Sequence, residues 1–251
     1  MEYSTFIWFI VGWIALAIIT FTALFKIVAP FGRHTSNRFG PTIPNNLGWM
    51  MMEIPSIVTI SYFYFTGSQS PNIVSGFIYG LWCVHYINRS FIYPFRQRNQ
   101  NKRMPLLIVG SAIFFNVVNG FFNGYYLGNF ADYDTSWFYS IPFLIGLIIF
   151  AAGMIINIRA DNKLLNLRKP GENDYKIPQG RLFKYISCPN LFGEMVEWTG
   201  YAILSWNPAA LSFAIWTFAN LFPRALAHHR WYHQKFEDYP SERKAVIPFV
   251  A

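Results

Sequence analysis

Seven long apolar runs constrain this chain more than any other feature of its sequence. A helix needs about 20 residues to cross the apolar layer of a bilayer, because it rises about 1.5 Å per residue. The runs cover residues 6–29, 47–65, 73–93, 105–126, 137–158, 191–206 and 208–226. The sequence therefore predicts an all-α polytopic membrane protein with seven transmembrane helices in a single integral-membrane domain, residues 1–251.

Composition agrees with a membrane protein, since 53% of the residues are hydrophobic and only 13% are charged, against about 25% charged in soluble domains. The first run starts at Phe6 with no basic residue before it, which argues against a cleavable signal peptide. The sixth run is short and the break at Asn207-Pro208 is tight, so one re-entrant hairpin over 191–226 is an alternative to two spans. The two cysteines, Cys83 and Cys188, suggest neither a disulfide nor a metal site.

The basic residues fix the expected orientation. All 20 lysines and arginines fall in segments 26–48, 89–104, 159–190 and 224–251. The segments on the other side of the predicted spans, residues 1–5, 66–72, 127–136 and 207, contain no lysine or arginine. Cytosolic loops of membrane proteins are rich in Lys and Arg. The N-terminus is therefore predicted to be outside or lumenal and the C-terminus cytosolic. The net charge of +8 is accounted for by this topology and does not call for a nucleic-acid partner.

A glutamate, Glu53, lies inside the second apolar run. A carboxylate at the centre of a bilayer costs about 2.5–3.5 kcal/mol on insertion scales. Glu53 is six residues from Leu47, about 9 Å deep, and Tyr86 of the third run is seven residues from Tyr93, about 10 Å deep. These two residues are therefore expected at one depth on sequential helices.

Other polar residues are expected at the same cytosolic level. They are Asn157 and Asp161 at the end of the fifth run, Glu194 and Glu197 in the sixth, and Arg224, His228 and Tyr232 at four-residue spacing after the seventh. Each alone has a structural explanation: Glu53 can pair with Arg89, and a boundary His or Arg can reach the interface. Their convergence favours a cavity open to the cytosol that holds a polar ligand.

The fourth run differs from the others in its polar and small residues. Asn116, Asn119 and Asn123 are expected nearer the middle or outer half, where asparagines often only bridge helices. Gly120, Gly124 and Gly128 are four residues apart, a spacing typical of a close-packing face for a neighbouring helix.

The cytosolic segments favour a phosphate-bearing ligand, because arginine binds phosphate in a bidentate manner. The cations concerned are Arg89, Arg96, Arg98, Lys102, Arg103, Arg168, Lys169, Arg181 and Arg224. Neither a dinucleotide-binding GxGxxG nor a P-loop motif is present, so a nucleotide would have to bind between membrane helices. Five histidines are too few for the several boxes of a membrane di-iron hydroxylase. A transporter is disfavoured because the chain has no internal repeat and its charges lie on one side.

Four segments resemble the steroid 5α-reductases, membrane enzymes that reduce Δ4-3-oxosteroids with NADPH. The segments are GMIINIRAD (153–161), LRKPGENDYKIPQG (167–180), NLFGEMVEWTGYA (190–202) and FEDYPSERKAVIPF (236–249). The last is a specific C-terminal signature, and the similarity runs from Glu53 onward. The chain is identified as a member of this family, a homologue of its type 2 enzyme.

The resemblance implies roles for matching positions. Glu53 and Tyr86 fall on residues that contact the substrate 3-oxo group. The NADPH site would comprise Asn157, Asp161, Arg168, Tyr175, Asn190, Arg224, His228 and Tyr232, with Arg89 and Arg103 near the phosphates and segments 159–190 and 224–251 capping the cofactor. Glu194 matches a glutamate near the nicotinamide, with Glu197 in its vicinity. No metal is implied.

Departures from the family pattern bear on the substrate rather than on the reaction. Met52 stands where the family often has glutamine, Asn88 where vertebrate enzymes have histidine, and Ala227 in place of one His of a triple-His run. The alternatives are therefore a related NADPH-dependent reductase of another sterol, polyprenol or enone lipid, and, outside enzymes, a cytosol-facing lipid transporter or a lipid-packing scaffold.

The expected chemistry is hydride addition to the β-carbon of the enone, which builds negative charge on the carbonyl oxygen. Tyr86 would donate a hydrogen bond to that oxygen, and Glu53 would orient Tyr86 or, when protonated, donate a proton itself. The steroid or other apolar enone would enter from the bilayer. Beyond lipid, neither a nucleic acid nor an obligate protein partner is indicated. The host would be the inner membrane of a bacterium or the endoplasmic reticulum of a eukaryote.

Overall fold

The protein is described by a computed structural model that places residues 1–28, 32, 40–97, 102–167, 172 and 174–251. These residues are mostly helical. Their α-helices are α1 (Tyr3–Leu24), α2 (Asn45–Phe65), α3 (Ile73–Ile87), α4 (Tyr93–Arg96), α5 (Leu106–Asn129), α6 (Ile141–Leu165), α7 (Pro189–Ser205) and α8 (Pro208–Lys235). A π-helical turn, Asn88–Ile92, joins α3 to α4, and 3₁₀ turns lie at Thr135–Tyr139 and Arg181–Lys184.

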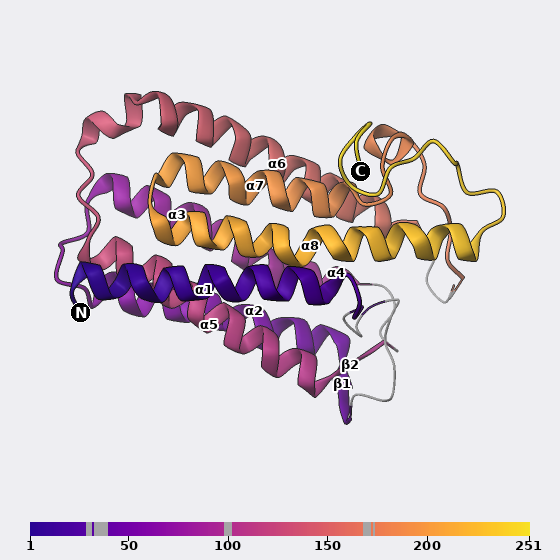
Figure 1. The fold of residues 1–251 in the computed structure, drawn as a ribbon, viewed down its shortest axis with the longest axis horizontal. Coiled ribbons are helices and arrows are strands. Elements are labelled where there is room, and N and C mark those ends of the chain that lie inside the picture. The colour runs from indigo at the N-terminus through magenta and orange to yellow at the C-terminus, as the bar shows by residue number, and fades with distance from the viewer. Residues whose placement is uncertain (29–31, 33–39, 98–101, 168–171, 173) are drawn as a thin grey trace.

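The long helices run side by side and alternate in direction (Figure 1). The N-terminus and the connections α2–α3, α5–α6 and α7–α8 lie at one end of the bundle, and the C-terminal tail and the short strands lie at the other. Three of the described helices, α1, α5 and α6, are long and apolar enough to cross a membrane. These helices are those of an integral membrane protein. The seven-span topology and its orientation stay predictions.

Several helices end where the apolar runs do not. Helix α6 continues past Ile158 to Leu165, and α8 continues past Leu226 to Lys235, because a helix that leaves an apolar layer keeps its backbone hydrogen bonds in water. Helix α1 ends at Leu24 rather than residue 29. The segment 189–235 forms two antiparallel helices joined by a turn at Trp206–Asn207.

The prediction of an all-α chain missed a small sheet. Strands β1 (Thr42–Pro44) and β2 (Arg103–Pro105) pair antiparallel, with Thr42 opposite Pro105. Each strand ends in a proline that precedes a long helix, α2 or α5. A proline's fixed φ and missing N–H suit this boundary between strand and helix. The sheet therefore ties together the starts of the two helices that carry Glu53 and Asn116.

Helices α2 and α5 pack backbone to backbone through the glycines of α5. A Cβ placed on Gly124 would lie 2.6 Å from the carbonyl oxygen of Ile60, and one on Gly120 would lie 3.1 Å from that of Ser56. Gly128 sits as closely against Phe63. The predicted close-packing face is confirmed, and α2 is the neighbour that uses it.

A second pair of helices, α6 and α7, packs equally closely through glycines seven residues apart. Gly146 and Gly153 of α6 face α7, and Gly193 and Gly200 of α7 face α6. A Cβ on Gly193 would lie 2.5 Å from the backbone nitrogen of Asn157. This approach brings the end of α6 within side-chain reach of the start of α7, where several predicted site residues lie.

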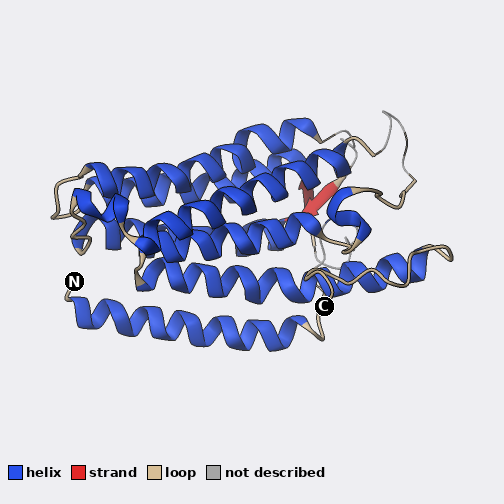
Figure 2. Ribbon diagram, turned by 90° about the horizontal axis from the view of Figure 1, so that it is seen from above, coloured by secondary structure: helices blue, strands red, loops and turns tan. Residues whose placement is uncertain are grey.

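Helix α1 lies along the outside of the bundle (Figure 2), where it packs against α5 and α8. Trp13 of α1 stacks near Trp216 of α8 with ring centroids 4.6 Å apart. The main core lies between α2, α3, α6, α7 and α8 and is dominated by buried aromatic side chains such as Trp82 and Trp198. A cavity opens in the space between α1 and the rest of the bundle.

Candidate functional site

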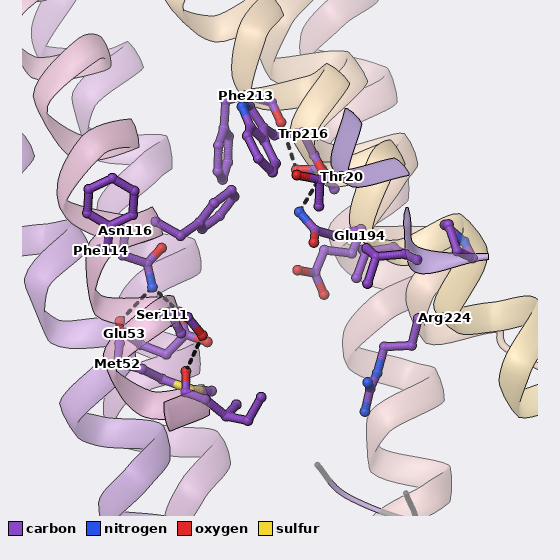
Figure 3. Close-up of a pocket in the computed structure, with 18 of the residues that line it drawn as sticks. Thr20, Met52, Glu53, Ser111, Phe114, Asn116, Glu194, Phe213, Trp216 and Arg224 are labelled. Carbon is purple, nitrogen blue, oxygen red and sulfur yellow. Dashed lines mark hydrogen bonds between the residues drawn. The ribbon is translucent and has the colours of Figure 1, made fainter. Parts of the chain in front are cut away.

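A cavity of about 460 Å³ lies between α1, α2, α5 and α8 (Figure 3). This volume is within the usual range for small-molecule sites, about 300–1,000 Å³. One part of its wall is apolar and aromatic, with Trp13, Phe115, Phe213 and Trp216. The other part carries charged and polar side chains, which are Glu53, His85, Tyr86, Arg89, Asn116, Glu194 and Arg224. An apolar body with one polar end would fit this wall.

The structure brings Glu53 and Tyr86 to one place, around the side chain of Asn116. The Asn116 amide nitrogen donates to the backbone oxygen of Met52 at 2.5 Å and to the Glu53 carboxylate at 3.3 Å. The Tyr86 hydroxyl donates to the Asn116 amide oxygen at 3.2 Å. All three side chains are buried and border the cavity. The group at this wall therefore contains a carboxylate and a phenol that are both within hydrogen-bond reach of one amide.

Local sequence explains how α2 offers these groups. Pro55 lies inside α2 and has no N–H for the carbonyl four residues earlier, that of Met51. The adjacent Met52 carbonyl accepts from Asn116. The turn that precedes Pro55 thus presents the Met52 carbonyl and the Glu53 side chain to Asn116 of α5.

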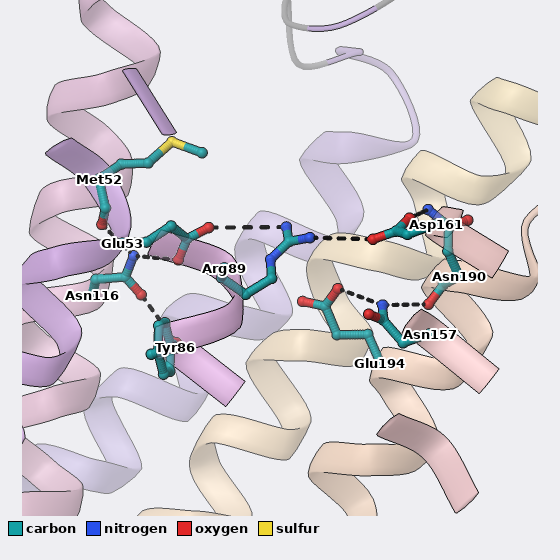
Figure 4. Close-up of polar contacts among 9 residues, drawn as sticks. All are labelled: Met52, Glu53, Tyr86, Arg89, Asn116, Asn157, Asp161, Asn190 and Glu194. Atoms are coloured by element: carbon teal, nitrogen blue, oxygen red, sulfur yellow. Dashed lines mark hydrogen bonds and ion pairs between the residues drawn. The ribbon is translucent and has the colours of Figure 1, made fainter. Parts of the chain in front are cut away.

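Arg89 lies at the centre of the charged groups (Figure 4). Its guanidinium nitrogens are 3.9 Å from a Glu53 oxygen and 3.6 Å from an Asp161 oxygen, and its charge lies over the ring of Trp49 at 4.5 Å. Arg89 sits in the π-helical turn. Pro94 has no N–H for the Ser90 carbonyl, and widened turns of this kind are frequent at functional sites. Arg89 therefore links the Glu53 cluster to α6.

A hydrogen-bond network continues from Asp161 along the α6–α7 contact (Figure 4). Asn190 donates to Asp161 at 3.0 Å, and Asn157 donates to the Asn190 backbone oxygen at 3.0 Å and to Glu194 at 3.4 Å. Four residues predicted for the cofactor and nicotinamide region are therefore mutually bonded, and Glu194 reaches the cavity.

The remaining predicted cofactor residues are more dispersed. Arg224 borders the cavity, whereas the Arg103 guanidinium bonds to Thr42 of β1, through its hydroxyl at 2.8 Å and its carbonyl at 2.5 Å. The Tyr175 ring packs on Trp231 with centroids 4.7 Å apart. Arg168 lies outside the described residues.

Two further predicted residues, His228 and Tyr232, lie on α8 beyond Arg224. His228 is half-buried. Tyr232 is buried and stacks on Tyr239 of the C-terminal tail, with centroids 5.0 Å apart and rings nearly parallel. Tyr232 therefore joins α8 to the tail.

The C-terminal tail, residues 236–251, folds back on the segment that precedes α7. Arg243 donates to the Pro178 carbonyl at 3.0 Å and to the Gln179 side chain at 2.8 Å. The Ser187 hydroxyl lies 2.7 Å from both the His229 ring nitrogen Nδ1 and the Tyr239 hydroxyl. These bonds hold the tail and the segment 174–188 together as one cover at this end of the bundle.

Protonation of His229 opposes this arrangement. Burial lowers the pKa of His229 to about 4, with smaller contributions from the neighbouring His233 and Lys244. The ring is therefore neutral at pH 7, and its Nδ1 can accept the hydrogen bond from Ser187.

Glu197 does not border the cavity. It lies one layer behind, fully buried, with a carboxylate oxygen 2.8 Å from Nδ1 of His85. His85 itself borders the cavity. Glu197 was expected near the substrate. In the structure His85 borders the cavity, and Glu197 is the hydrogen-bond partner of His85.

Sequence reasoning missed three features of this site. Asn116 was expected nearer the middle or outer half of its helix and instead bonds both Glu53 and Tyr86. His85, which borders the cavity, had no role in the site predicted from the sequence. The contribution of α1, through residues such as Thr20, had no signal except that its run is as apolar as a lipid-facing helix.

Comparisons with known proteins agree with the motifs. The family model described as 3-oxo-5-alpha-steroid 4-dehydrogenase matches residues 102–251. The chain is 44% identical over 225 residues to 3-oxo-5-alpha-steroid 4-dehydrogenase 1 of Macaca fascicularis, covering 88% of this chain and 84% of the relative. It is 40% identical over 240 residues to Steroid 5-alpha-reductase DET2 of Gossypium hirsutum, covering 94% and 93%.

The similarity to the human 3-oxo-5-alpha-steroid 4-dehydrogenase 1 is 42% identity over 225 residues, covering 88% of this chain and 85% of the relative. These relatives include type 1 enzymes, and a particular kinship with the type 2 enzyme stays a prediction. The family model covers α5 to α8 and the C-terminal signature. The chain belongs to the steroid 5α-reductase (3-oxo-5-alpha-steroid 4-dehydrogenase) family, oxidoreductases that act on CH–CH groups.

Proposed function

We propose that this protein reduces the Δ4 double bond of 3-oxo-Δ4-steroids to the 5α-3-oxosteroids, with NADPH as reductant. The observation that carries the proposal is the Glu53–Asn116–Tyr86 cluster in the polar part of a cavity whose other part is apolar and aromatic. A steroid is an apolar body with a carbonyl at one end. The cavity matches that distribution of polarity.

The residues beside the cavity fit a nicotinamide dinucleotide. Arg89 and Arg224 border it and have the geometry to bind phosphates. Asn157 and Glu194, bonded at 3.4 Å, offer both donors and acceptors for a carboxamide and a ribose. NADPH, when bound here, would supply the hydride that adds to C5 of the steroid.

The role of Tyr86 follows from the charge that reduction creates. Addition at C5 places negative charge on the 3-oxo oxygen, and a preorganised donor in a dry site stabilises it strongly. In the structure the Tyr86 hydroxyl proton is directed at the Asn116 amide oxygen. The substrate carbonyl would take the place of that amide oxygen as acceptor.

Glu53 and Asn116 would act on Tyr86 from the side of α2 and α5. The Asn116 nitrogen donates to two acceptors on α2, which turns the amide oxygen toward Tyr86 and holds the phenol at the cavity wall until a substrate carbonyl replaces that oxygen as acceptor. Glu53 in its protonated form can donate to the substrate carbonyl directly, and in its ionised form it holds Arg89 and Asn116 in place.

The test compares Glu53→Gln and Tyr86→Phe with the wild-type protein in detergent, with progesterone as substrate. Both variants should lose at least about 100-fold in kcat, the usual range for removal of a donor to a developing oxyanion. Both should bind NADPH with a Kd within about threefold of wild type. Full turnover in either variant would contradict the assigned role.

A substrate panel separates this function from that of a related reductase of another sterol, polyprenol or enone lipid. The wild-type protein should consume NADPH fastest with a Δ4-3-oxosteroid. Faster consumption with a polyprenol or a non-steroidal enone would replace the substrate and leave the reaction type standing. A lipid transporter would oxidise NADPH with none of them.

A further inference from the structure

The buried pair of His85 on α3 and Glu197 on α7 has no part in the function proposed above. The two side chains meet at 2.8 Å, and Glu197 is 0% exposed. The second Glu197 oxygen, Oε2, is buried and has no hydrogen-bond partner among the described residues. A buried carboxylate oxygen left without a partner costs free energy. If this contact only had to pack α3 against α7, apolar side chains of similar volume would stabilise it at least as well.

The imidazole stands between the carboxylate and the cavity. His85 borders the cavity and Glu197 does not, and Nδ1 is the nitrogen on Glu197. The other ring nitrogen, Nε2, is not engaged by Glu197, and it is the nitrogen that could meet a ligand in the cavity that His85 borders. A carboxylate on one imidazole nitrogen fixes the tautomer, holds the protonated ring in place and leaves the other nitrogen to exchange a proton with a ligand.

Packing fixes the ring next to the carbonyl-binding group. The His85 ring is 5.1 Å from the Tyr86 ring and 4.6 Å from the Trp198 ring, edge to face in both cases. Besides Glu197, three charged groups interact electrostatically with His85. They are Glu194 of α7, Arg89 of the π-helical turn and Glu53 of α2. The ring thus lies among charged groups of the proposed reaction site and cannot turn away from it.

Enone reduction needs one proton that the carbonyl cluster does not provide. The reaction adds a hydride to the β-carbon and a proton to the α-carbon, next to the carbonyl. Tyr86 and Glu53 are engaged with the carbonyl oxygen in the proposed function. His85 is the adjacent residue and borders the same cavity.

We propose that His85, held by Glu197, is the catalytic acid that protonates the α-carbon, an inference that rests on the proposed function. The electron pair of the enolate forms the new C–H bond while the Nε2–H bond of the imidazolium breaks. The ring is left neutral with its Nδ1–H on Glu197 and regains a proton from water. Together with the hydride from NADPH, the step balances as enone + NADPH + H⁺ → saturated ketone + NADP⁺. Glu197 is a positioning residue for the ring.

The test uses His85→Gln, since glutamine keeps hydrogen-bonding capacity at this position and cannot deliver a proton. We expect kcat to fall by about 100-fold or more, within the usual range for a lost general acid. The KM for steroid and the Kd for NADPH should stay within about threefold. In D₂O, wild-type product should carry solvent deuterium on a single face of the α-carbon, and the product of the variant should carry it on both faces.

Glu197→Gln is the second variant, in case His85→Gln does not fold. It keeps the volume of the side chain and removes the negative charge that holds the imidazolium, so the same fall in kcat and a shift of the pH profile are expected. Tyr64→Phe is the matched control, because it removes a different buried bond of α3, the one that joins Tyr64 of α2 to Ser75 at 3.0 Å. It should leave both kcat and the labelled face unchanged.

Three outcomes decide the matter. A fall in kcat with loss of face selectivity and intact binding supports the acid. A kcat within threefold of wild type with single-face labelling, in whichever of the two variants folds, overturns it and leaves a helix bridge. Absence of enone reduction by the wild-type protein overturns the proposed function and this inference with it.

Discussion

Replacing Gly193 by alanine tests whether the α6–α7 contact builds the cofactor side of the site. The new Cβ would lie 2.5 Å from the Asn157 backbone nitrogen and 2.8 Å from the Gly153 carbonyl oxygen. Ordinary van der Waals contact begins at 3.4 Å, so the helices must separate by the difference, about 0.9 Å. The bond from Asn157 to the Asn190 carbonyl, 3.0 Å long, would then stretch to about 3.9 Å and be lost.

The cost has two parts. Overpacking of a tight contact costs about 1–3 kcal/mol, and a buried polar group that loses its partner costs about 1–3 kcal/mol. The expected loss in the free energy of unfolding is therefore about 2–6 kcal/mol. The same substitution at Gly80, where a Cβ meets nothing within 4 Å, should gain up to about 1 kcal/mol from helix propensity.

Thermal unfolding of the two variants in detergent gives the comparison. At about 2–4 °C per kcal/mol for a chain of this size, Gly193→Ala should melt at least about 4 °C below Gly80→Ala. Its NADPH Kd should rise at least tenfold, which is about 1.4 kcal/mol. Equal melting temperatures and equal NADPH affinities would refute the claim that this glycine sets the spacing of the Asn157 network.

Three further results are expected. Asn116→Leu should lower kcat about 10- to 100-fold, because Tyr86 loses the amide that orients it. Asn123→Leu is the control and should leave kcat unchanged, because among the bonds described the Asn123 amide bonds only the backbone of its own helix. Equal kcat values in the two variants would contradict the role of Asn116. Arg89→Lys should raise the Kd for NADPH about tenfold, since an ammonium cannot act as a planar fork, and an unchanged Kd by titration would argue against it. Because the pKa of His229 is lowered to about 4, the unfolded tail binds the proton more tightly, and the stability of the C-terminal tail should fall as pH drops from about 6.5 toward 4. Hydrogen exchange of residues 236–251, corrected for intrinsic rates, should show this loss in wild type and not in His229→Gln.

The sequence predicts how deep a residue lies along the bundle better than it predicts the direction in which the side chain points. Counting residues from a span end gave Glu53 and Tyr86 matching depths, and the structure has them on one amide. The same count put Asn116 too far from that layer. Side chains lean toward the N-terminus of a helix, and the N-terminus of α5 is at the end of the bundle where Glu53 lies, so Asn116 reaches back to it.

Close contacts were predictable only where the spacing was a familiar one. Four-residue glycine spacing predicted that α5 has a close-packing face for a neighbouring helix but not that the neighbour is α2. The seven-residue spacing of Gly146 with Gly153 and of Gly193 with Gly200 led to no prediction of the α6–α7 contact. Hydropathy predicted the residues at which α6 and α8 become polar. It did not predict where the two helices end, which is several residues later. The partner of His85 could not be foreseen, because Glu197 lies on a helix more than 100 residues away.

Transfer of label from deuterated cofactor tests the central claim most directly. Purified wild-type protein is given NADPH carrying deuterium at both C4 positions of the nicotinamide, with progesterone as substrate, and the steroid product is analysed by mass spectrometry and NMR. The account predicts one deuterium at C5 on the α face and one NADPH consumed per steroid reduced. Absence of deuterium at C5, or NADPH oxidation that does not depend on the steroid, would contradict it.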